Sequence, residues 1–277
     1  MSRSRPELSV EFFPPKNAQG EERLAECLQA FRSLGPAYAS VTYGAGGSTQ
    51  TRTLATVALL QKRGDFPAVP HLTCIGSTPE GIRELLQQYR ELGIQKIVAL
   101  RGDLPAGMDN PGVFRHASDL VAFIRDFGGF TVLASAYPEV HPQAENAVQD
   151  LHYLAAKVQA GAAGLITQYC YNPDAILQLR DALARLGVTV PLTVGVMPIS
   201  NYEQIARFSA QCGAEIPRYL RLGMEALAHD PAGQRELAAD LVARQCALLL
   251  DEGLPGLHFY TLNQAEATLA ITQRLGI

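Results

Sequence analysis

Tryptophan is absent from this 277-residue sequence, and several signals of common protein classes are absent with it. No run of lysine and arginine marks a nucleic-acid or membrane surface, and the net charge is only −4. No apolar stretch approaches the ~20 residues that cross a bilayer, and we detect no signal peptide. The five cysteines form no CxxC pair, so we expect a reduced, cytoplasmic protein.

Eight short β-rich segments recur along the chain, and several are apolar almost throughout, as strands covered on both faces must be. They are Leu8–Phe13, Tyr38–Tyr43, Ala68–Thr73, Lys96–Leu100, Thr131–Ala136, Gly164–Gln168, Leu192–Met197 and Leu257–Thr261. Amphipathic segments between them predict helices at Glu21–Leu34, Thr78–Leu92, Gln143–Ala160, Pro173–Leu186, Pro231–Glu252 and Gln264–Leu275.

This alternation predicts an α/β fold, a single-domain (βα)8 TIM barrel over residues 1–277. A doubly wound open sheet is the alternative, but it usually carries a G-x-G-x-x-G turn after its first strand. The glycine-rich turn here, 44–47, follows the second strand, and Thr49 stands where a third glycine is needed. We therefore favour the barrel.

Polar side chains gather at the carboxyl ends of the predicted strands, where barrel enzymes place their active sites. Glu11 lies inside an apolar strand, and an unpaired buried carboxylate is expensive, so a functional role is favoured over a structural one. A second acid, Asp103, follows the fourth strand. Two acids in one polar pocket suggest that one is protonated for acid catalysis and the other is kept ionised.

Other chemistries are compatible with the same residues. A pair of carboxylates also fits a glycosidase, although the lack of tryptophan disfavours a sugar site. His71 and His141 leave a metal hydrolase open, but each histidine alone is more often structural.

Eight motifs, in order along nearly the whole chain, resemble the bacterial 5,10-methylenetetrahydrofolate reductase family. They are Val10–Lys16, Ser40–Ala45, Pro70–Ile75, Val98–Pro105, Ala136–Pro142, Ile166–Gln168, Met197–Tyr202 and His258–Asn263. The resemblance implies a (βα)8 barrel with non-covalent FAD. It also implies a ping-pong reaction in which NADH or NADPH reduces the flavin, which then reduces methylenetetrahydrofolate to methyltetrahydrofolate for methionine synthesis. No metal is implied.

The resemblance also implies roles for individual residues. Glu11 matches the general acid that protonates the bridging folate nitrogen, a role that needs a carboxyl still protonated near neutral pH. Asp103 matches a folate-contacting aspartate beside the flavin, and Gln168 matches a residue shared by the pterin and nicotinamide sites. Gln204 and Phe208 match further substrate contacts, with Phe208 in the helix after the seventh strand.

The implied FAD-binding residues are Thr42, Tyr43, Ala45, His71, Arg101, Gly102, Asp103, Ala117, Tyr137, His141, Asp150 and Lys157. Three positions depart from the family pattern. Gln264 replaces an arginine that often contacts the folate glutamate tail, His116 replaces a common tyrosine, and Ala156 stands at a position that can be arginine.

The resemblance leads to further expectations about the whole protein. We expect no regulatory domain beyond the barrel, and we expect the chain to form a homo-oligomer. A folate-binding methyltransferase barrel without flavin, and a non-catalytic flavin- or folate-binding barrel, are the alternatives. Neither the preference for NADH or NADPH nor the number of subunits follows from the sequence.

Overall fold

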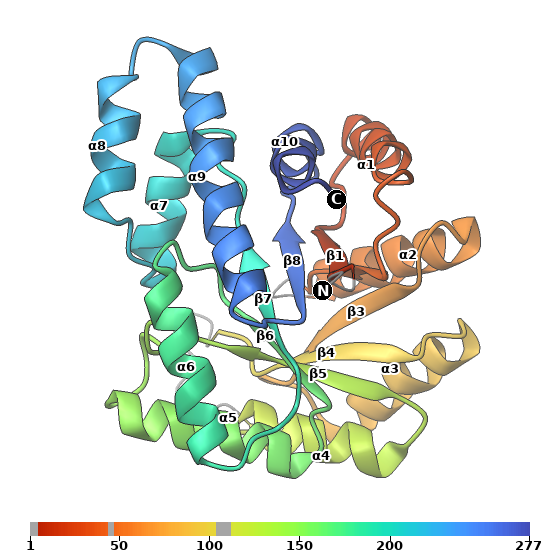
Figure 1. Cartoon of the computed structure of the whole chain (residues 1–277). Helices are drawn as coiled ribbons and strands as arrows, with labels where there is room; N and C mark the ends of the chain where they lie inside the picture. Colours follow the sequence, from red (N-terminus) through yellow and green to blue (C-terminus); the bar gives the residue numbers. More distant parts are fainter. Residues whose placement is uncertain (1–4, 44–46, 104–111) are drawn as a thin grey trace.

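The computed structural model describes residues 5–43, 47–103 and 112–277, and its eight parallel strands close into a barrel (Figure 1). The strands are β1 Glu7–Phe12, β2 Tyr38–Val41, β3 Ala68–Thr73, β4 Lys96–Leu100, β5 Thr131–Ala136, β6 Gly164–Thr167, β7 Leu192–Val196 and β8 Gly256–Tyr260. Each strand pairs with the next one along the chain, and β8 pairs with β1. The predicted (βα)8 barrel is confirmed, and the doubly wound alternative is wrong because the sheet has no edge strand.

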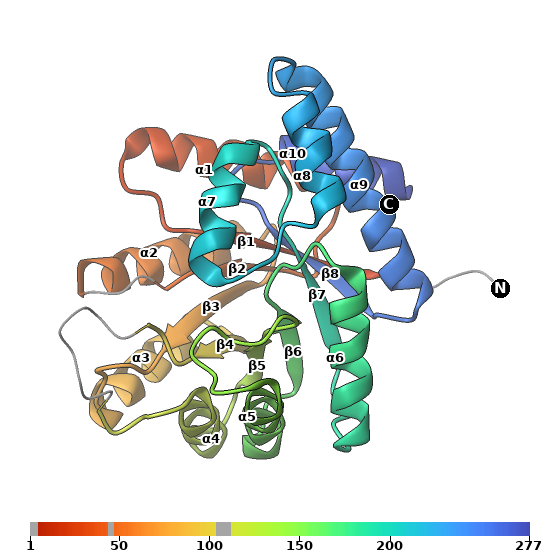
Figure 2. The same ribbon diagram turned by 90° about the vertical axis from the view of Figure 1, so that its left-hand side faces the viewer.

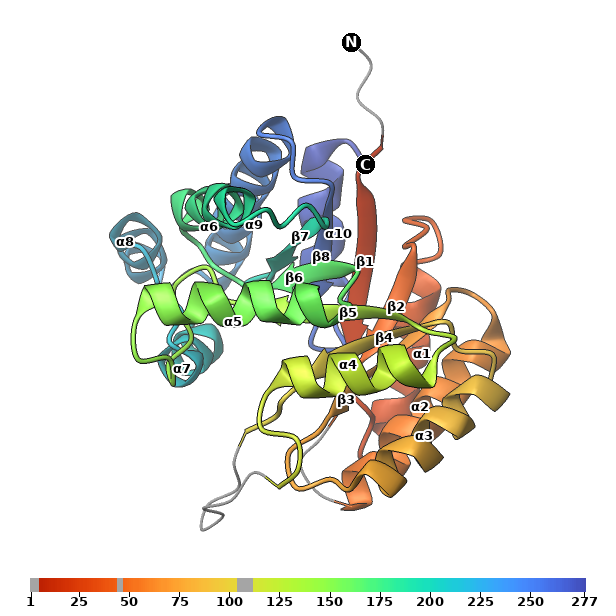
Figure 3. The same cartoon turned by 90° about the horizontal axis from the view of Figure 1, so that it is seen from below.

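The helices surround this barrel (Figure 3). They are α1 Ala18–Ala30, α2 Gly47–Arg63, α3 Pro79–Glu91, α4 Ala117–Phe127, α5 Ala147–Ala160, α6 Pro173–Arg185, α7 Tyr202–Cys212, α8 Arg218–Ala226, α9 Pro231–Asp251 and α10 Glu266–Leu275. The helix predicted over Gln143–Ala160 corresponds to α5, but its predicted start at Gln143 is wrong. Asn146 caps α5, because its side chain accepts the Gln149 N–H at 2.9 Å. Among the described residues, no helix combines the length and hydropathy of a membrane span.

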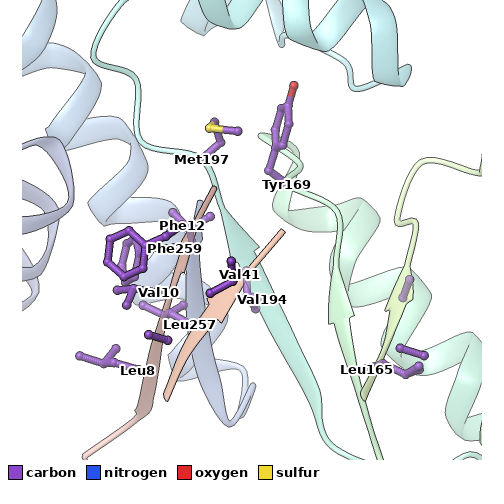
Figure 4. Packing of buried hydrophobic residues seen from close by; sticks show 14 of the residues in the cluster. Leu8, Val10, Phe12, Val41, Leu165, Tyr169, Val194, Met197, Leu257 and Phe259 are labelled. Atoms are coloured by element: carbon purple, nitrogen blue, oxygen red, sulfur yellow. The ribbon is translucent and has the colours of Figure 1, made fainter. Parts of the chain in front are cut away.

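Successive side chains of each strand point alternately outward, to the core between the strands and the helices, and inward, to the interior of the barrel. Figure 4 shows Leu8, Val10 and Phe12 of β1 gathered with apolar residues of β8 on one side of these strands. The intervening Ser9 and Glu11 therefore face the barrel interior. Because Ser9 pairs with His258 and Glu11 with Tyr260, the β8 residues beside them face inward as well.

The ends of β1 and β8 are joined by Asn263. Its Oδ1 accepts the Phe13 N–H at 3.0 Å, and its Nδ2 donates to the Phe13 carbonyl at 2.9 Å. Asn263 is buried and has φ 55°, a left-handed conformation that asparagine tolerates better than most residues. These bonds hold the loop beside Glu11.

Replacing Asn263 with alanine is therefore expected to destabilise the protein by about 1–3 kcal/mol, because the part-buried N–H and carbonyl of Phe13 both lose their partner. Urea denaturation measures this change in the free energy of unfolding. Gln264→Ala, at the exposed neighbouring position, is the control and should shift stability by less than ~0.5 kcal/mol. Similar small losses in both variants would contradict a structural role for Asn263.

Candidate active site

A cavity of about 630 Å³ opens at the carboxyl ends of the strands. Residues from all parts of the barrel line it, including Glu11, Thr42, Tyr43, His71, Asp103, Tyr137, His141, Gln168, Phe208, His258 and Tyr260. We call it the main pocket. The sequence-based expectation that polar strand ends meet at one face is confirmed, because closing the barrel brings eight separate segments around one opening.

A smaller cavity of about 300 Å³ continues from the main pocket and is called the side pocket here. The two share Leu100, Asp103, Ser135, Tyr137, His141 and Gln143 in their walls. The side pocket adds Arg101, Gly102, His116, Ala117, Asp150, Tyr153 and Lys157. Every proposed FAD-binding residue that the structure describes thus lines one joined cavity. Ala45 lies outside the described residues.

Three ionisable side chains meet on the inner wall of the main pocket. Glu11 Oε2 lies 3.3 Å from His71 Nε2 and 3.5 Å from His258 Nε2. The Glu11–His71 distance describes an ion pair rather than a well-oriented hydrogen bond, since His71 Nε2 is a buried atom without a hydrogen-bond partner. This unsatisfied nitrogen borders the cavity and is available to a bound molecule.

The electrostatic environment of Glu11 differs from the one expected from the sequence. Burial raises the pKa of Glu11, but the charge of His71 and the close polar contacts of both imidazoles with the carboxylate outweigh it and lower the pKa to about 2. The expectation that Glu11 itself stays protonated near neutral pH is therefore wrong for this state of the protein. Both histidine nitrogens lie within 3.5 Å of the Glu11 carboxylate, and we call Glu11, His71 and His258 the Glu11 cluster.

His258 belongs to this cluster, although it was not among the predicted site residues. Its Nδ1 lies 2.7 Å from Ser9 Oγ, and its ring stacks on Tyr38 with 5.8 Å between the ring centroids. The residue is only 1% exposed. Its sequence signal is weak, because His258 lies in the middle of β8 rather than at its end, and only the alternation of β8 indicates that it faces inward.

Gly195 of β7 makes room for the side chain of Tyr260 on the neighbouring strand β8. A Cβ at this position would lie 2.0 Å from the Thr167 carbonyl and 2.8 Å from the Tyr260 ring. The Tyr260 hydroxyl donates to that carbonyl at 2.7 Å. The ring is thereby fixed in the wall of the main pocket, near Glu11.

Positive charge lies along the side pocket. Lys157 Nζ donates to the Ser135 carbonyl at 2.7 Å, and burial, partly offset by Asp150, lowers the pKa of Lys157 to about 8. Asp150 also accepts the His141 N–H at 2.9 Å. Arg101 bonds to Gln143. Two cationic side chains beside a cavity suit an anionic group such as a phosphate.

Gly102 lines the side pocket and packs closely against Thr73 and Ile75. Its φ is +88°, and an added Cβ would lie 3.0 Å from Ile75 and 3.1 Å from Thr73. A side chain at this position would therefore be strained and crowded. The neighbouring Asp103 is exposed and lines both pockets.

The outer predicted substrate contacts do not all reach the cavities. Phe208 lines the main pocket, which agrees with its predicted place, whereas Gln204 and Gln264 line neither of the two pockets described here. Gln204 lies in the first turn of α7, and Gln264 is exposed after β8. Within the described ranges no group of three His, Cys, Asp or Glu side chains could hold a metal, so the hydrolase alternative has no ligand set there.

Comparison with known proteins identifies relatives over the whole chain. The family model described as methylenetetrahydrofolate reductase matches residues 1–276. The 5,10-methylenetetrahydrofolate reductases of Pectobacterium carotovorum subsp. carotovorum and Escherichia coli (strain K12) are 38% and 37% identical, over 98% of this chain and 90% of each relative. The methylenetetrahydrofolate reductase (NADH) 1 of Arabidopsis thaliana is 36% identical, over 97% of this chain and 48% of its own length.

Solved structures support the fold independently. An uncharacterized Clostridium thermocellum protein that binds two copies of 5-methyl-5,6,7,8-tetrahydrofolic acid matches with a TM-score of 0.68 at 15% identity, covering 99% of this chain and 97% of that one. At this identity the likeness concerns the fold alone. The match of the family model and the identity to bacterial relatives decide the family: this chain belongs to the methylenetetrahydrofolate reductases.

Proposed function

We propose that this protein reduces 5,10-methylenetetrahydrofolate to 5-methyltetrahydrofolate, using NADH or NADPH and a bound FAD. Its bacterial relatives, which match nearly the whole chain, are named as enzymes of this reaction. The observation that carries the proposal is Glu11, whose side chain is 14% exposed, flanked by two histidines and facing a pocket of about 630 Å³. The product would serve methionine synthesis.

The residues present fit an FAD molecule. The two joined cavities suit an elongated ligand, and Arg101 and Lys157 line the side pocket, where the pyrophosphate would find cations. His71 Nε2, a buried nitrogen without a hydrogen-bond partner, borders the main pocket. When bound, FAD would supply the redox chemistry by accepting a hydride from the nicotinamide nucleotide and returning it to the folate.

The protein's own side chains divide the remaining tasks. The Glu11 cluster would deliver the proton to the bridging folate nitrogen, opening the five-membered ring to an iminium. In this scheme Glu11 passes the proton to the folate, and His71 and His258 position the Glu11 carboxyl group. Asp103, at the junction of the pockets, would stabilise the positive charge of the iminium.

Gln168 would orient whichever heterocycle occupies the main pocket. Its Oε1 accepts the Tyr169 N–H at 3.0 Å, which holds the side-chain amide at the end of β6. An amide both donates and accepts hydrogen bonds, so it suits a pterin and a nicotinamide alike.

An anaerobic spectroscopic experiment tests the proposal. The purified protein should be yellow, NADH or NADPH should bleach it, and methylenetetrahydrofolate should then restore the colour. Running the two nucleotides separately gives the preference between them. A colourless protein that takes up no FAD would favour the methyltransferase alternative. Flavin that stays reduced in the presence of the folate would favour the non-catalytic one.

We also propose that the protein is a cytoplasmic homo-oligomer whose 277 residues form one catalytic unit. Large apolar side chains are exposed on the outer helices, including Tyr219, Leu222 and Leu248, with 54%, 43% and 43% of each accessible. Such side chains are common at subunit interfaces. Light scattering on the purified protein measures the oligomeric state, and a monomer at all concentrations would contradict the expectation.

A further inference from the structure

Helix α7 contributes side chains to the main pocket although few of its residues are buried. Ile205 and Ser209 are its two buried residues, whereas α9 buries six. Figure 2 shows α8 running alongside α9, while α7 stands apart from both in front of the strands. Yet Phe208, Gln211 and Cys212 of α7 line the main pocket. Since Tyr202, Phe208 and Cys212 pack only partly buried against the core, specific polar contacts add to the packing that holds α7.

The first of these contacts comes from Tyr169, the residue directly after Gln168. The Tyr169 hydroxyl lies 3.2 Å from Ser209 Oγ, and the Cys212 thiol donates to it at 3.3 Å. Figure 4 shows the Tyr169 side chain extending away from the strands. Tyr169 and Ser209 are 4% and 2% exposed, so neither hydroxyl has water as a ready substitute partner.

The second contact joins the C-terminal end of α7 to the loop after β5. Both carboxylate oxygens of Glu139 lie 3.2 Å from the Glu215 backbone nitrogen, which donates to them. Gly213 ends α7 with a φ of +76°. It lies so close to Pro142 that a Cβ added to Gly213 would be 3.0 Å from the Pro142 ring. The same loop carries Tyr137 and His141, which line both pockets.

We propose that Tyr169 and Glu139 are positioning residues that dock α7 at the mouth of the main pocket, and that this docking sets the affinity for the flat heterocyclic substrate. Tyr169 links the strand end carrying Gln168 to the helix carrying Phe208, so the amide and the aromatic ring keep a constant separation. A flat heterocycle held between them gains affinity from that preorganisation. The inference deepens the proposed function and rests on it for the identity of the substrate.

Hydrogen exchange measures the docking without reference to activity. The flavin-loaded protein, without substrate, is compared with Tyr169→Phe and Ser209→Ala by mass spectrometry. We expect amide exchange in residues 202–212 to accelerate about threefold to tenfold in each, since both variants lose the buried Tyr169–Ser209 hydrogen bond and Tyr169→Phe also loses the Cys212 contact. The double variant should exchange no faster than the faster single variant, because both changes break the same bond.

Tyr89→Phe is the matched control. Tyr89 is also a buried tyrosine, but its hydroxyl has no hydrogen-bond partner among the described residues. Its replacement should leave exchange in α7 unchanged. Glu139→Ala tests the second contact and should accelerate exchange around residues 213–217. Unchanged exchange in both the Tyr169 and the Ser209 variants would overturn the docking role of Tyr169, and unchanged exchange in Glu139→Ala that of Glu139.

Steady-state kinetics measure the consequence for the substrate. We expect KM for methylenetetrahydrofolate to rise about threefold to tenfold in Tyr169→Phe, with kcat and the Kd for FAD changed less than twofold. Faster exchange with an unchanged KM would overturn the link to substrate affinity. If the wild-type protein reduces no methylenetetrahydrofolate, the proposed function fails, whereas hydrogen exchange still decides whether Tyr169 docks α7.

Discussion

Replacing Glu11 with glutamine should leave the reduction of flavin by NADH or NADPH nearly unchanged and slow the reduction of methylenetetrahydrofolate about 100- to 10,000-fold. Glutamine keeps the size of the side chain but can neither hold a charge nor pass on a proton. Flavin reduction by a nicotinamide nucleotide requires no proton from this residue. The ring-opening of the folate does.

Anaerobic stopped-flow absorbance separates the two half-reactions in the flavin-loaded protein. Glu7→Gln is the matched control, because Glu7 lies at the opposite end of the same strand and is exposed. It should leave both rates within about twofold of the wild type. Equal losses in both half-reactions of Glu11→Gln would contradict the acid role and indicate general damage to the pocket.

His258→Asn extends this test to the imidazole beside Glu11. Asparagine can still reach Ser9, which lies 2.7 Å from the histidine in the present structure, but it carries no titratable proton. If the cluster delivers the proton jointly, the folate half-reaction slows while flavin reduction continues. If Glu11 acts alone, the folate half-reaction is unaffected.

Replacing Lys157 with methionine should stabilise the ligand-free protein while weakening its affinity for FAD. Burial lowers the pKa of Lys157 to about 8, so holding the ammonium in the fold at pH 7 costs free energy. After allowing for the lost hydrogen bond to the Ser135 carbonyl, we expect a net gain of about 1–2 kcal/mol. The Kd for FAD should rise about tenfold or more, because a charge-assisted contact to phosphate is lost.

The pH dependence of stability provides a second measurement of the same effect. Lys157 has a lower pKa in the folded protein than in the unfolded chain, where it is 10.5. Between about pH 8 and 10.5 the unfolded chain therefore binds more protons, and the Lys157 contribution raises stability as pH rises. The stabilisation of Lys157→Met over the wild type should shrink across this range.

Thermal unfolding of the flavin-free protein and fluorescence titration with FAD make these two measurements. Lys62→Met, at an exposed position near the end of α2, is the control and should change neither quantity appreciably. A variant at Lys157 that is destabilised, or that binds FAD as tightly as the wild type, would show that the lysine serves only the fold.

The strands were predictable from the sequence because their residues carry a local signal. Apolar β-rich runs such as the one ending at Leu100 are bounded by turn residues, and most predicted limits lie within one or two residues of the observed ones. The sequence predicts no bounds for helices α2, α4, α7 and α8, and α7 enters only as the helix that carries Phe208. The short α8 has no counterpart in a simple strand–helix alternation, because it is inserted between α7 and α9.

The candidate site was only partly accessible to the same reasoning. Residues at strand ends, such as Glu11 and Gln168, were identified because parallel strands in a barrel end on one face. His258 was missed since its role depends on the pairing of Ser9 with His258 between β1 and β8. Gln264 shows the converse, because the resemblance implied a contact with the folate tail, yet this residue lines neither pocket.

By itself, the sequence determined the barrel, its working face and the family to which the chain belongs, since these follow from local periodicity and from motifs in order along the chain. Only the tertiary structure decided the protonation of Glu11. Its burial within an apolar strand favours the neutral acid, but His71 and His258 from two other strands outweigh that effect and lower its pKa to about 2. The charge of a group depends on neighbours brought close by the closed barrel, and those neighbours lie up to 247 positions away along the chain, from Glu11 to His258.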